Sequence, residues 1–241
     1  MKHINLFNLN SEYELYKNSS EYVTPEVSFI EETNTVFYVP KQELYEWVDL
    51  GLPSGILWSA WNVGAENPED FGLYFAWGET EGYSDEDVIS GKKAFSWEDY
   101  KFGPRTNLTK YNYTDNLTQL ELVDDVAHKS NNTCRMPTNA DFEELIDNTT
   151  STWETLNGVS GKRYTSNNGN SIFIPASGYY VYDDGEATLA LVGSYGYLWS
   201  STLSSSLDTK AYRLVFQDSL IDGVTGASRN LGYAIRPVKS K

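Results

Sequence analysis

The chain has 241 residues, of which 40% are hydrophobic and 15% aromatic, so enough apolar surface exists for a core and general disorder is excluded. Its 34 acidic and 18 basic residues give a net charge of −16, which argues against a nucleic-acid partner and against attraction to anionic lipid. The single cysteine, Cys134, excludes an intramolecular disulfide. The 18 tyrosines are typical either of binding surfaces or of aromatic cores in small sheets.

Residues 1–42 are expected to form a small N-terminal attachment unit. Ser11 and Glu14 have the spacing of a capping box and predict a short helix. Residues 27–40, VSFIEETNTVFYVP, predict a two-stranded hairpin that ends at a proline. A unit of this size has little core of its own, so we expect it to pack on the main domain or to attach the protein to something larger.

We expect no export signal and no membrane insertion. The first residues lack the apolar run of a secretion signal, and no later segment has the apolar length that crosses a bilayer. The protein is therefore expected either to stay in the cytoplasm or to leave the cell within a particle released by lysis.

Residues 43–241 are expected to form the main domain, which is rich in short strands, glycine turns and aromatic residues. Residues 48–64 predict two strands around a Pro-Ser-Gly turn, and residues 71–79, FGLYFAWGE, predict an aromatic strand. Residues 136–148 predict a helix in which Thr138 is the N-cap and Asp141 lies at the third helical position. The buried face of this helix is expected to carry Phe142, Leu145 and Ile146.

Two further segments predict strands near the C-terminus. Residues 171–185, SIFIPASGYYVYDDG, predict a strand, a bend and a second strand rich in tyrosine. Residues 210–217, KAYRLVFQ, alternate, and alternate side chains of a strand lie on opposite faces. One face is expected to carry Tyr212, Leu214 and Phe216 and to anchor the sheet, while the other carries Arg213, Val215 and Gln217 and points to water.

Several motifs occur together in one order, and their combination resembles a large group of gut-Bacteroidetes and phage proteins with a C-type-lectin-like fold. That fold is shared with the formylglycine-generating (sulfatase-modifying) enzymes. The resemblance covers roughly residues 44–238. It is carried by VDLGLPSGILWSAWNVGA, YFAWGET, CRMPTNADFEELI, YTSNNGNSIFIPASGY, YLWSST and GYAIRPV.

Some members of this group are variable proteins of diversity-generating retroelements. In these proteins the segment between Trp-Ser-Ser-Thr and Arg-Pro-Val is rewritten at chosen codons, and residues 197–238 have that layout. The resemblance implies a display surface within residues 195–238 whose side chains bind a ligand. The expected ligand-binding residues are Tyr195, Tyr197, Leu203, Lys210, Arg213, Val215, Gln217, Asp222, Val224, Thr225, Ser228, Asn230 and Leu231.

The resemblance implies an α+β protein with a C-type-lectin-like fold of short twisted antiparallel strands, few helices and long loops. It implies non-catalytic recognition of a host-surface protein or glycan, in a phage tail or a similar adhesive particle. A trimer or another homo-oligomer is the corresponding assembly. A divergent sulfatase-modifying-like enzyme and a structural particle component remain the alternatives, as does an exposed polar hairpin with no partner.

The sequence offers few residues for metal or cofactor chemistry, and we expect neither a metal nor a cofactor. A copper site of paired cysteines cannot be built from Cys134 alone, and a three-histidine iron site cannot be built from His3 and His128. The lectin motifs that hold calcium are missing. The acidic clusters at 85–87 and 183–186 could hold Ca²⁺, but solvated acidic loops are the simpler interpretation.

Overall fold

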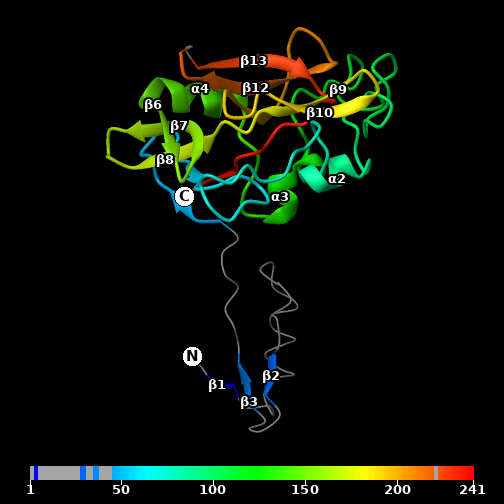
Figure 1. Ribbon diagram of the computed structural model, residues 1–241. Helices are drawn as coiled ribbons and strands as arrows, with labels where there is room; N and C mark the ends of the chain where they lie inside the picture. Colours follow the sequence, from blue (N-terminus) through cyan, green and yellow to red (C-terminus); the bar gives the residue numbers. More distant parts are fainter. Residues whose placement is uncertain (1–2, 5–27, 31–34, 38–44, 220–221) are drawn as a thin grey trace. The chain divides into compact units, whose positions relative to one another are not determined.

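The computed structural model describes residues 3–4, 28–30, 35–37, 45–219 and 222–241 (Figure 1). Contacts divide the chain into one unit of residues 1–44 and a second of residues 45–241. The helix expected at Ser11 lies outside the described residues. The first unit holds an antiparallel sheet in the order β1-β3-β2, formed by β1 (His3–Ile4), β2 (Ser28–Ile30) and β3 (Thr35–Phe37).

The pairing of β2 with β3 confirms the predicted hairpin. Phe29 lies opposite Val36, and Ile30 lies opposite Thr35.

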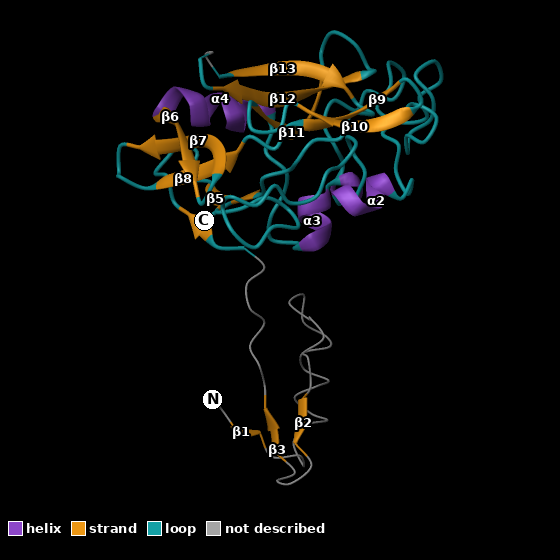
Figure 2. Ribbon diagram, in the orientation of Figure 1, coloured by secondary structure: helices purple, strands orange, loops and turns teal. Residues whose placement is uncertain are grey.

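The second unit is a mixed α+β structure of short antiparallel sheets with few helices, and much of it is loop (Figure 2). One sheet joins the two ends of the unit in the order β14-β5-β4. A second sheet is a meander in the order β6-β7-β8. Their strands are β4 (Trp47–Val48), β5 (Leu57–Ser59), β14 (Val238–Lys239), β6 (Thr149–Leu156), β7 (Val159–Ser166) and β8 (Ser171–Pro175).

The C-terminal half adds a hairpin and a three-stranded sheet. The hairpin pairs β9 (Tyr179–Asp183) with β10 (Glu186–Ala190). The sheet has the order β11-β12-β13 and consists of β11 (Tyr195–Leu203), β12 (Lys210–Gln217) and β13 (Gly223–Ser228). These elements confirm the strands predicted within residues 171–185 and 210–217.

The helices are short, and each begins at a side chain that accepts a backbone hydrogen bond, except the 3-10 turn η2 (Leu122–Asp124). In α4 (Asn139–Asn148), Thr138 and Asp141 form a reciprocal capping box, which confirms the predicted start. Phe142 and Leu145 are fully buried and Ile146 is partly buried, as predicted. The other helices are α2 (Asp85–Ile89) and α3 (Val126–Ser130). No helix among the described residues is long and apolar enough to cross a membrane.

Two hydrophobic clusters fill the second unit, and the sheet of β11, β12 and β13 separates them. One face of this sheet packs with α4 and contributes Leu198, Leu214 and Phe216 to a smaller cluster. The other face contributes Tyr197, Trp199, Ala211 and Ala227 to a larger, mainly aromatic cluster. The sequence predicted one anchored face and one face open to water, and this was wrong because a second cluster covers much of the other face.

The aromatic strand predicted for residues 71–79 is also wrong. The segment forms only isolated bridges, in which Tyr74 pairs with Tyr83 and Phe75 pairs with Tyr233. Its aromatic residues are buried because they fill the larger cluster, and Trp77 Nε1 donates to the Ser200 carbonyl at 2.8 Å. The apolar composition of this segment therefore indicates that its residues are buried, and it does not indicate that they form a strand.

Two buried arginines hold loops together without a carboxylate partner among the described residues. Arg236 donates to Asn62 Oδ1, to the Ser59 carbonyl and to the Phe173 carbonyl. Arg229 donates to the Tyr100 hydroxyl and to the carbonyls of Tyr111, Asp208 and Lys110. Its guanidinium also lies over four rings, with the ring of Trp77 at 4.8 Å.

Candidate functional site

The pairing of β11 with β12 places three residues of each strand on one face of the sheet. Tyr195 lies opposite Gln217, Tyr197 opposite Val215, and Trp199 opposite Arg213. Directly opposite side chains in an antiparallel pair contact each other, so this register creates a mixed aromatic and polar surface.

Four tyrosine rings and one guanidinium pack together on this face, and we call Tyr179, Tyr195, Tyr197, Tyr233 and Arg213 the tyrosine platform. The rings of Tyr195 and Tyr197 are stacked with centroids 5.8 Å apart, and those of Tyr197 and Tyr233 are stacked at 5.2 Å. Tyr179 meets both Tyr197 and Tyr233 edge to face. Each contact fixes a ring orientation and adds stability beyond simple burial.

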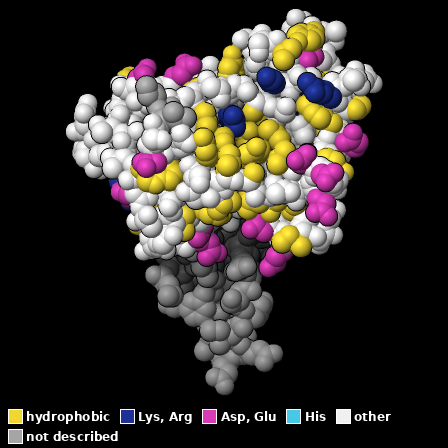
Figure 3. Space-filling model, turned by 45° about the horizontal axis from the view of Figure 1, so that its top comes forward, with side chains coloured by type: hydrophobic (Ala, Val, Ile, Leu, Met, Phe, Trp, Pro, Cys, Tyr) yellow, Lys and Arg dark blue, Asp and Glu magenta, His cyan; other side chains and the backbone are white. Residues whose placement is uncertain are grey.

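The platform joins the β9–β10 hairpin to the β11–β12–β13 sheet, because Tyr179 is the first residue of β9. Figure 3 turns this side of the molecule forward and shows hydrophobic side chains gathered in the middle of the face, with most Asp and Glu side chains nearer the margins. Tyr179, Val181, Tyr195 and Val215 are half-buried. The surface thus combines accessible apolar groups with a supporting aromatic core.

Arg213 lies at the centre of the platform. Its guanidinium carbon is 4.5 Å from the Tyr197 ring centroid and 5.1 Å from that of Tyr233. Arg213 Nη1 donates to the Tyr233 hydroxyl at 2.6 Å. Arg213 Nε is buried and has no hydrogen-bond partner in the described part of the chain. No described carboxylate forms an ion pair with Arg213, although acidic residues outnumber basic ones almost two to one.

The hydroxyls of Tyr197 and Tyr233 are held in the neutral form, in which they can donate hydrogen bonds. Burial raises the pKa of Tyr197, and the positive charge of Arg213 only partly offsets this. Burial likewise raises the pKa of Tyr233, although the positive charge of Arg213 acts to lower it. No hydrogen bond within the described residues occupies the hydroxyls of Tyr179 or Tyr195. The platform is therefore rich in hydrogen-bond donors that no side chain of this part of the chain uses.

The structure brings together some of the predicted display residues. Arg213 lies opposite Thr225 of β13, and Thr225 is exposed. One face of the sheet thus carries Tyr195, Tyr197, Arg213, Val215, Gln217 and Thr225.

Three predicted display residues lie on the opposite face of the sheet, which corrects the expected surface. Lys210 is paired with Ser228, and Val224 is paired with Leu214 and packs against the smaller cluster. The reason is the two-residue period of a strand, since Lys210 and Arg213 are three positions apart and must point to opposite sides.

Three other predicted display residues are buried. Tyr197 is 5% exposed because its ring lies between those of Tyr195 and Tyr233. Asn230 is 7% exposed, and its amide donates to the Phe95 carbonyl at 2.7 Å. The Asp222 side chain is 4% exposed and forms an ion pair with Lys162 of β7 at 2.6 Å. Local sequence could not indicate these partners because they come from distant segments.

Leu203 and Leu231 are half-buried and pack against the larger cluster, so neither is a fully exposed contact residue. Sequence reasoning missed two platform residues, Tyr179 and Tyr233. Tyr233 stands in the terminal GYAIRPV motif, which carries the resemblance but supplied no expected ligand-binding residue. The available signal was the tyrosine-rich segment 179–182, whose alternation places Tyr179 and Tyr180 on opposite faces.

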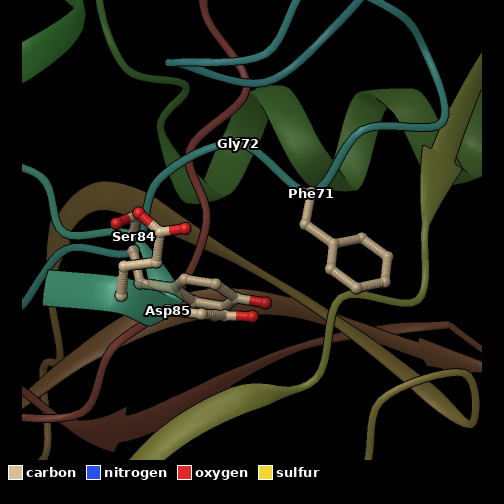
Figure 4. A pocket seen from close by; sticks show the side chains of 6 residues that line it. Phe71, Gly72, Ser84 and Asp85 are labelled. Atoms are coloured by element: carbon tan, nitrogen blue, oxygen red, sulfur yellow. The ribbon is translucent and has the colours of Figure 1, made fainter. Parts of the chain in front are cut away.

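A separate hollow of about 310 Å³ lies beside α2 and is lined by Phe71, Gly72, Tyr74, Ser84, Asp85 and Glu86. Figure 4 shows the Phe71 ring on one side of it and Ser84 and Asp85 on the other. Asp85 Oδ1 accepts a hydrogen bond from the Tyr180 hydroxyl at 2.8 Å. None of the platform residues lines this hollow.

The residues considered for metal or nucleophilic chemistry have structural partners. No group of three or more His, Cys, Asp or Glu among the described residues could hold a metal ion. Burial raises the pKa of the Cys134 thiol to about 12, and the thiol contacts the Ala127 and Asn131 carbonyls. His128 Nδ1 lies 3.3 Å from the Cys134 carbonyl. The acidic residues 85–87 form the first turn of α2, where Asp87 completes a capping box with Ser84.

Comparisons with known proteins give one match. Residues 146–238 match a family model described as Domain of unknown function (DUF8237). This stretch runs from α4 to β14 and includes every residue of the tyrosine platform. No curated protein matches the chain, and no solved structure matches it.

Proposed function

We propose that the second unit has a C-type-lectin-like fold and that the protein is a non-catalytic recognition protein, which binds a host-surface protein or glycan through the tyrosine platform. The ordered motifs of the sequence support the fold, together with the short antiparallel sheets and the β14-β5-β4 sheet that joins the two ends of the unit. A phage tail or a comparable adhesive particle is the setting that the resemblance favours.

The observation that carries the proposal is the composition of the platform. Tyrosine and arginine are, with tryptophan, the residue types enriched at the energetic centres of protein interfaces, and here they form one connected cluster on a partly accessible sheet face. The rings are held by their neighbours before any ligand arrives, so binding orders few side chains.

Binding to intact cells tests this function. The fluorescently labelled full chain is mixed with a panel of gut-Bacteroidetes strains, and bound protein is measured by flow cytometry. A platform variant carries Tyr195→Ser, Arg213→Ser and Gln217→Ala. A control variant carries Ile89→Ser, Val123→Ser and Arg105→Gln, which removes exposed apolar and basic groups elsewhere.

The expected result is saturable binding of the wild type and of the control variant to at least one strain, with loss of binding by the platform variant at an unchanged fold. Equal binding by the platform variant, or no binding of the wild type to any strain, contradicts the proposal. A neighbouring reverse-transcriptase gene with a near-copy of the segment that encodes residues 197–238 would add support for a variable protein.

A further inference from the structure

The cation at the centre of the tyrosine platform has no charge partner in the part of the chain that the structure describes. The buried Lys162 is paired with Asp222 and the buried Lys93 with Glu79, whereas the polar and cation–π partners of the Arg213 guanidinium among the described residues are two tyrosine rings and one hydroxyl. A guanidinium held over aromatic faces is oriented without being neutralised. The Arg213 guanidinium is therefore preorganised to bind a negatively charged group.

The polar groups around Arg213 favour a ligand that accepts hydrogen bonds. Arg213 Nε has no partner, and the hydroxyls of Tyr179 and Tyr195 are not occupied by described residues. Nε itself is buried, so an incoming acceptor would meet the other donors of the guanidinium, which carries five N–H groups in all. Carboxylate oxygens match the planar fork of a guanidinium, and charge-assisted hydrogen bonds are the strong ones.

The number of cations limits the charge of the ligand. Arg213 is the single basic member of the platform, and the whole chain carries a net charge of −16. A polyanion such as a nucleic acid or a sulfated polysaccharide needs several basic contacts to overcome that field. The platform consequently suits one carboxylate on an otherwise neutral or apolar surface.

The surroundings of Arg213 favour a protein over a sugar. Val215 lies two residues after Arg213 on β12, Val181 lies two residues after Tyr179 on β9, and both are half-buried. They add apolar contact area to the same face of the platform. The platform is built on the face of a sheet, and the hollow described beside α2 is lined by other residues. A broad apolar surface with one central charge matches the core of a protein interface.

We propose that the tyrosine platform is a receptor for one Asp or Glu side chain of a protein partner, with Arg213 pairing with the carboxylate. This inference rests on the proposed recognition function and names the chemistry of its ligand. The carboxylate approaches Arg213 while neighbouring apolar groups of the partner cover the tyrosine rings and Val215.

The first test uses nuclear magnetic resonance on the full chain with defined probes. The α-amide of N-acetyl-glutamate is titrated while the Arg213 Nε–H signal and the tyrosine ring signals are followed, and the α-amide of N-acetyl-glutamine is the uncharged control. Sodium glucuronate represents an acidic sugar. The same titrations are performed on Arg213→Gln and, as a matched loss of one surface arginine, on Arg105→Gln.

The glutamate probe is expected to shift these signals in the wild type and in Arg105→Gln, with the glutamine probe about tenfold weaker or more. The response should disappear in Arg213→Gln. Equal responses to the two amides, or a response that persists in Arg213→Gln, overturn the proposal. Tighter binding of glucuronate than of the glutamate amide also overturns it, since the carboxylate would then belong to a sugar.

Cell binding separates this inference from the function on which it rests. If Arg213→Gln alone binds cells as the wild type does while the triple platform variant does not, the proposed recognition function is supported. The proposed pairing of Arg213 with a carboxylate is then contradicted. If neither variant loses binding, the recognition surface itself lies elsewhere. Loss of binding by Arg213→Gln with retention by Arg105→Gln supports both.

Discussion

The Arg213 guanidinium lies over the Tyr197 ring, 4.5 Å from its centroid, and links β12 to β11 across the pair of strands. This contact lies on an accessible face, whereas the similar contact between Arg229 and Trp77 lies in the interior. Both arginines thus lie over aromatic rings but differ in burial, and this difference predicts different effects of substitution.

Arg213→Gln is expected to lower the free energy of unfolding by about 1–2 kcal/mol, because it removes two cation–π contacts of a half-buried side chain and one hydrogen bond. Arg229→Gln is expected to cost about 3 kcal/mol or more, because three carbonyls and the buried Tyr100 hydroxyl lose the donor that a fully buried side chain supplies. Urea denaturation measures both. Equal losses of unfolding free energy would mean that Arg213, like Arg229, stabilises the interior of the fold, and would contradict its placement on the binding surface.

Trp199→Ala is expected to destabilise the second unit by about 3–5 kcal/mol. The indole is fully buried, its Nε1 donates to the Phe75 carbonyl at 2.8 Å, and its ring lies 4.4 Å from that of Tyr233. Thermal unfolding followed by near-ultraviolet circular dichroism provides the measurement. Trp153→Ala is the control, since Trp153 is only partly buried and should cost less. A near-neutral Trp199→Ala would contradict the packing described for β11.

Gly196→Ala is expected to be destabilising by about 1–3 kcal/mol through overpacking. A Cβ atom at this position would overlap with the Phe216 ring at Cζ, on the paired strand β12. The substitution Phe216→Leu removes the clashing atoms, so the double variant should lose less than the sum of the two single variants. A double-mutant cycle of unfolding free energies measures this coupling, and strict additivity would contradict the proposed contact.

Asp124→Asn tests a buried carboxylate that holds two loops together. Its oxygens accept from Lys101 at 2.6 Å, Lys110 at 2.6 Å and the Tyr111 hydroxyl at 2.7 Å. Burial favours the neutral acid, but the hydrogen bonds from Lys101, Lys110 and Tyr111 outweigh it and hold the pKa of Asp124 below its ordinary value. Removing the charge should cost about 1.5–3 kcal/mol at neutral pH.

The pH dependence of this effect follows from the lowered pKa. A carboxyl group with a lower pKa in the folded state stabilises the fold above its unfolded pKa of about 3.9, and that contribution disappears as the pH falls through the folded value. The difference in unfolding free energy between wild type and Asp124→Asn should therefore be constant from neutral pH down to about pH 5 and shrink below about pH 4. A constant difference down to the acid transition would show that Asp124 is not the titrating group.

The local elements of this protein could largely be predicted from its sequence. Thr138 and Asp141 identify the start of α4 because capping depends on side chains only three residues apart. The alternation of residues 210–217 likewise identifies β12. In each case the interactions that decide the structure lie within a few residues of one another.

The candidate site could be predicted only in part, because its environment is built from distant segments. The burial of Asp222 depends on Lys162, and that of Asn230 depends on the Phe95 carbonyl. The larger hydrophobic cluster covers much of the sheet face that carries Arg213, and most of its residues precede β6 in the chain. Treating Lys210 and Arg213 as one surface was a local error, since the period of a strand already places them on opposite sides.

Arg229 restricts which residues can be exchanged at the end of the β12–β13 hairpin during evolution. Thr225, four residues earlier in the chain, is exposed to solvent. The buried Arg229 side chain, in contrast, donates hydrogen bonds to the carbonyls of Lys110, Tyr111 and Asp208. A lineage that acquired new specificities by exchanging residues of β12 and β13 would have to preserve this single codon, and it would inherit the conformation of the Lys110 loop along with it.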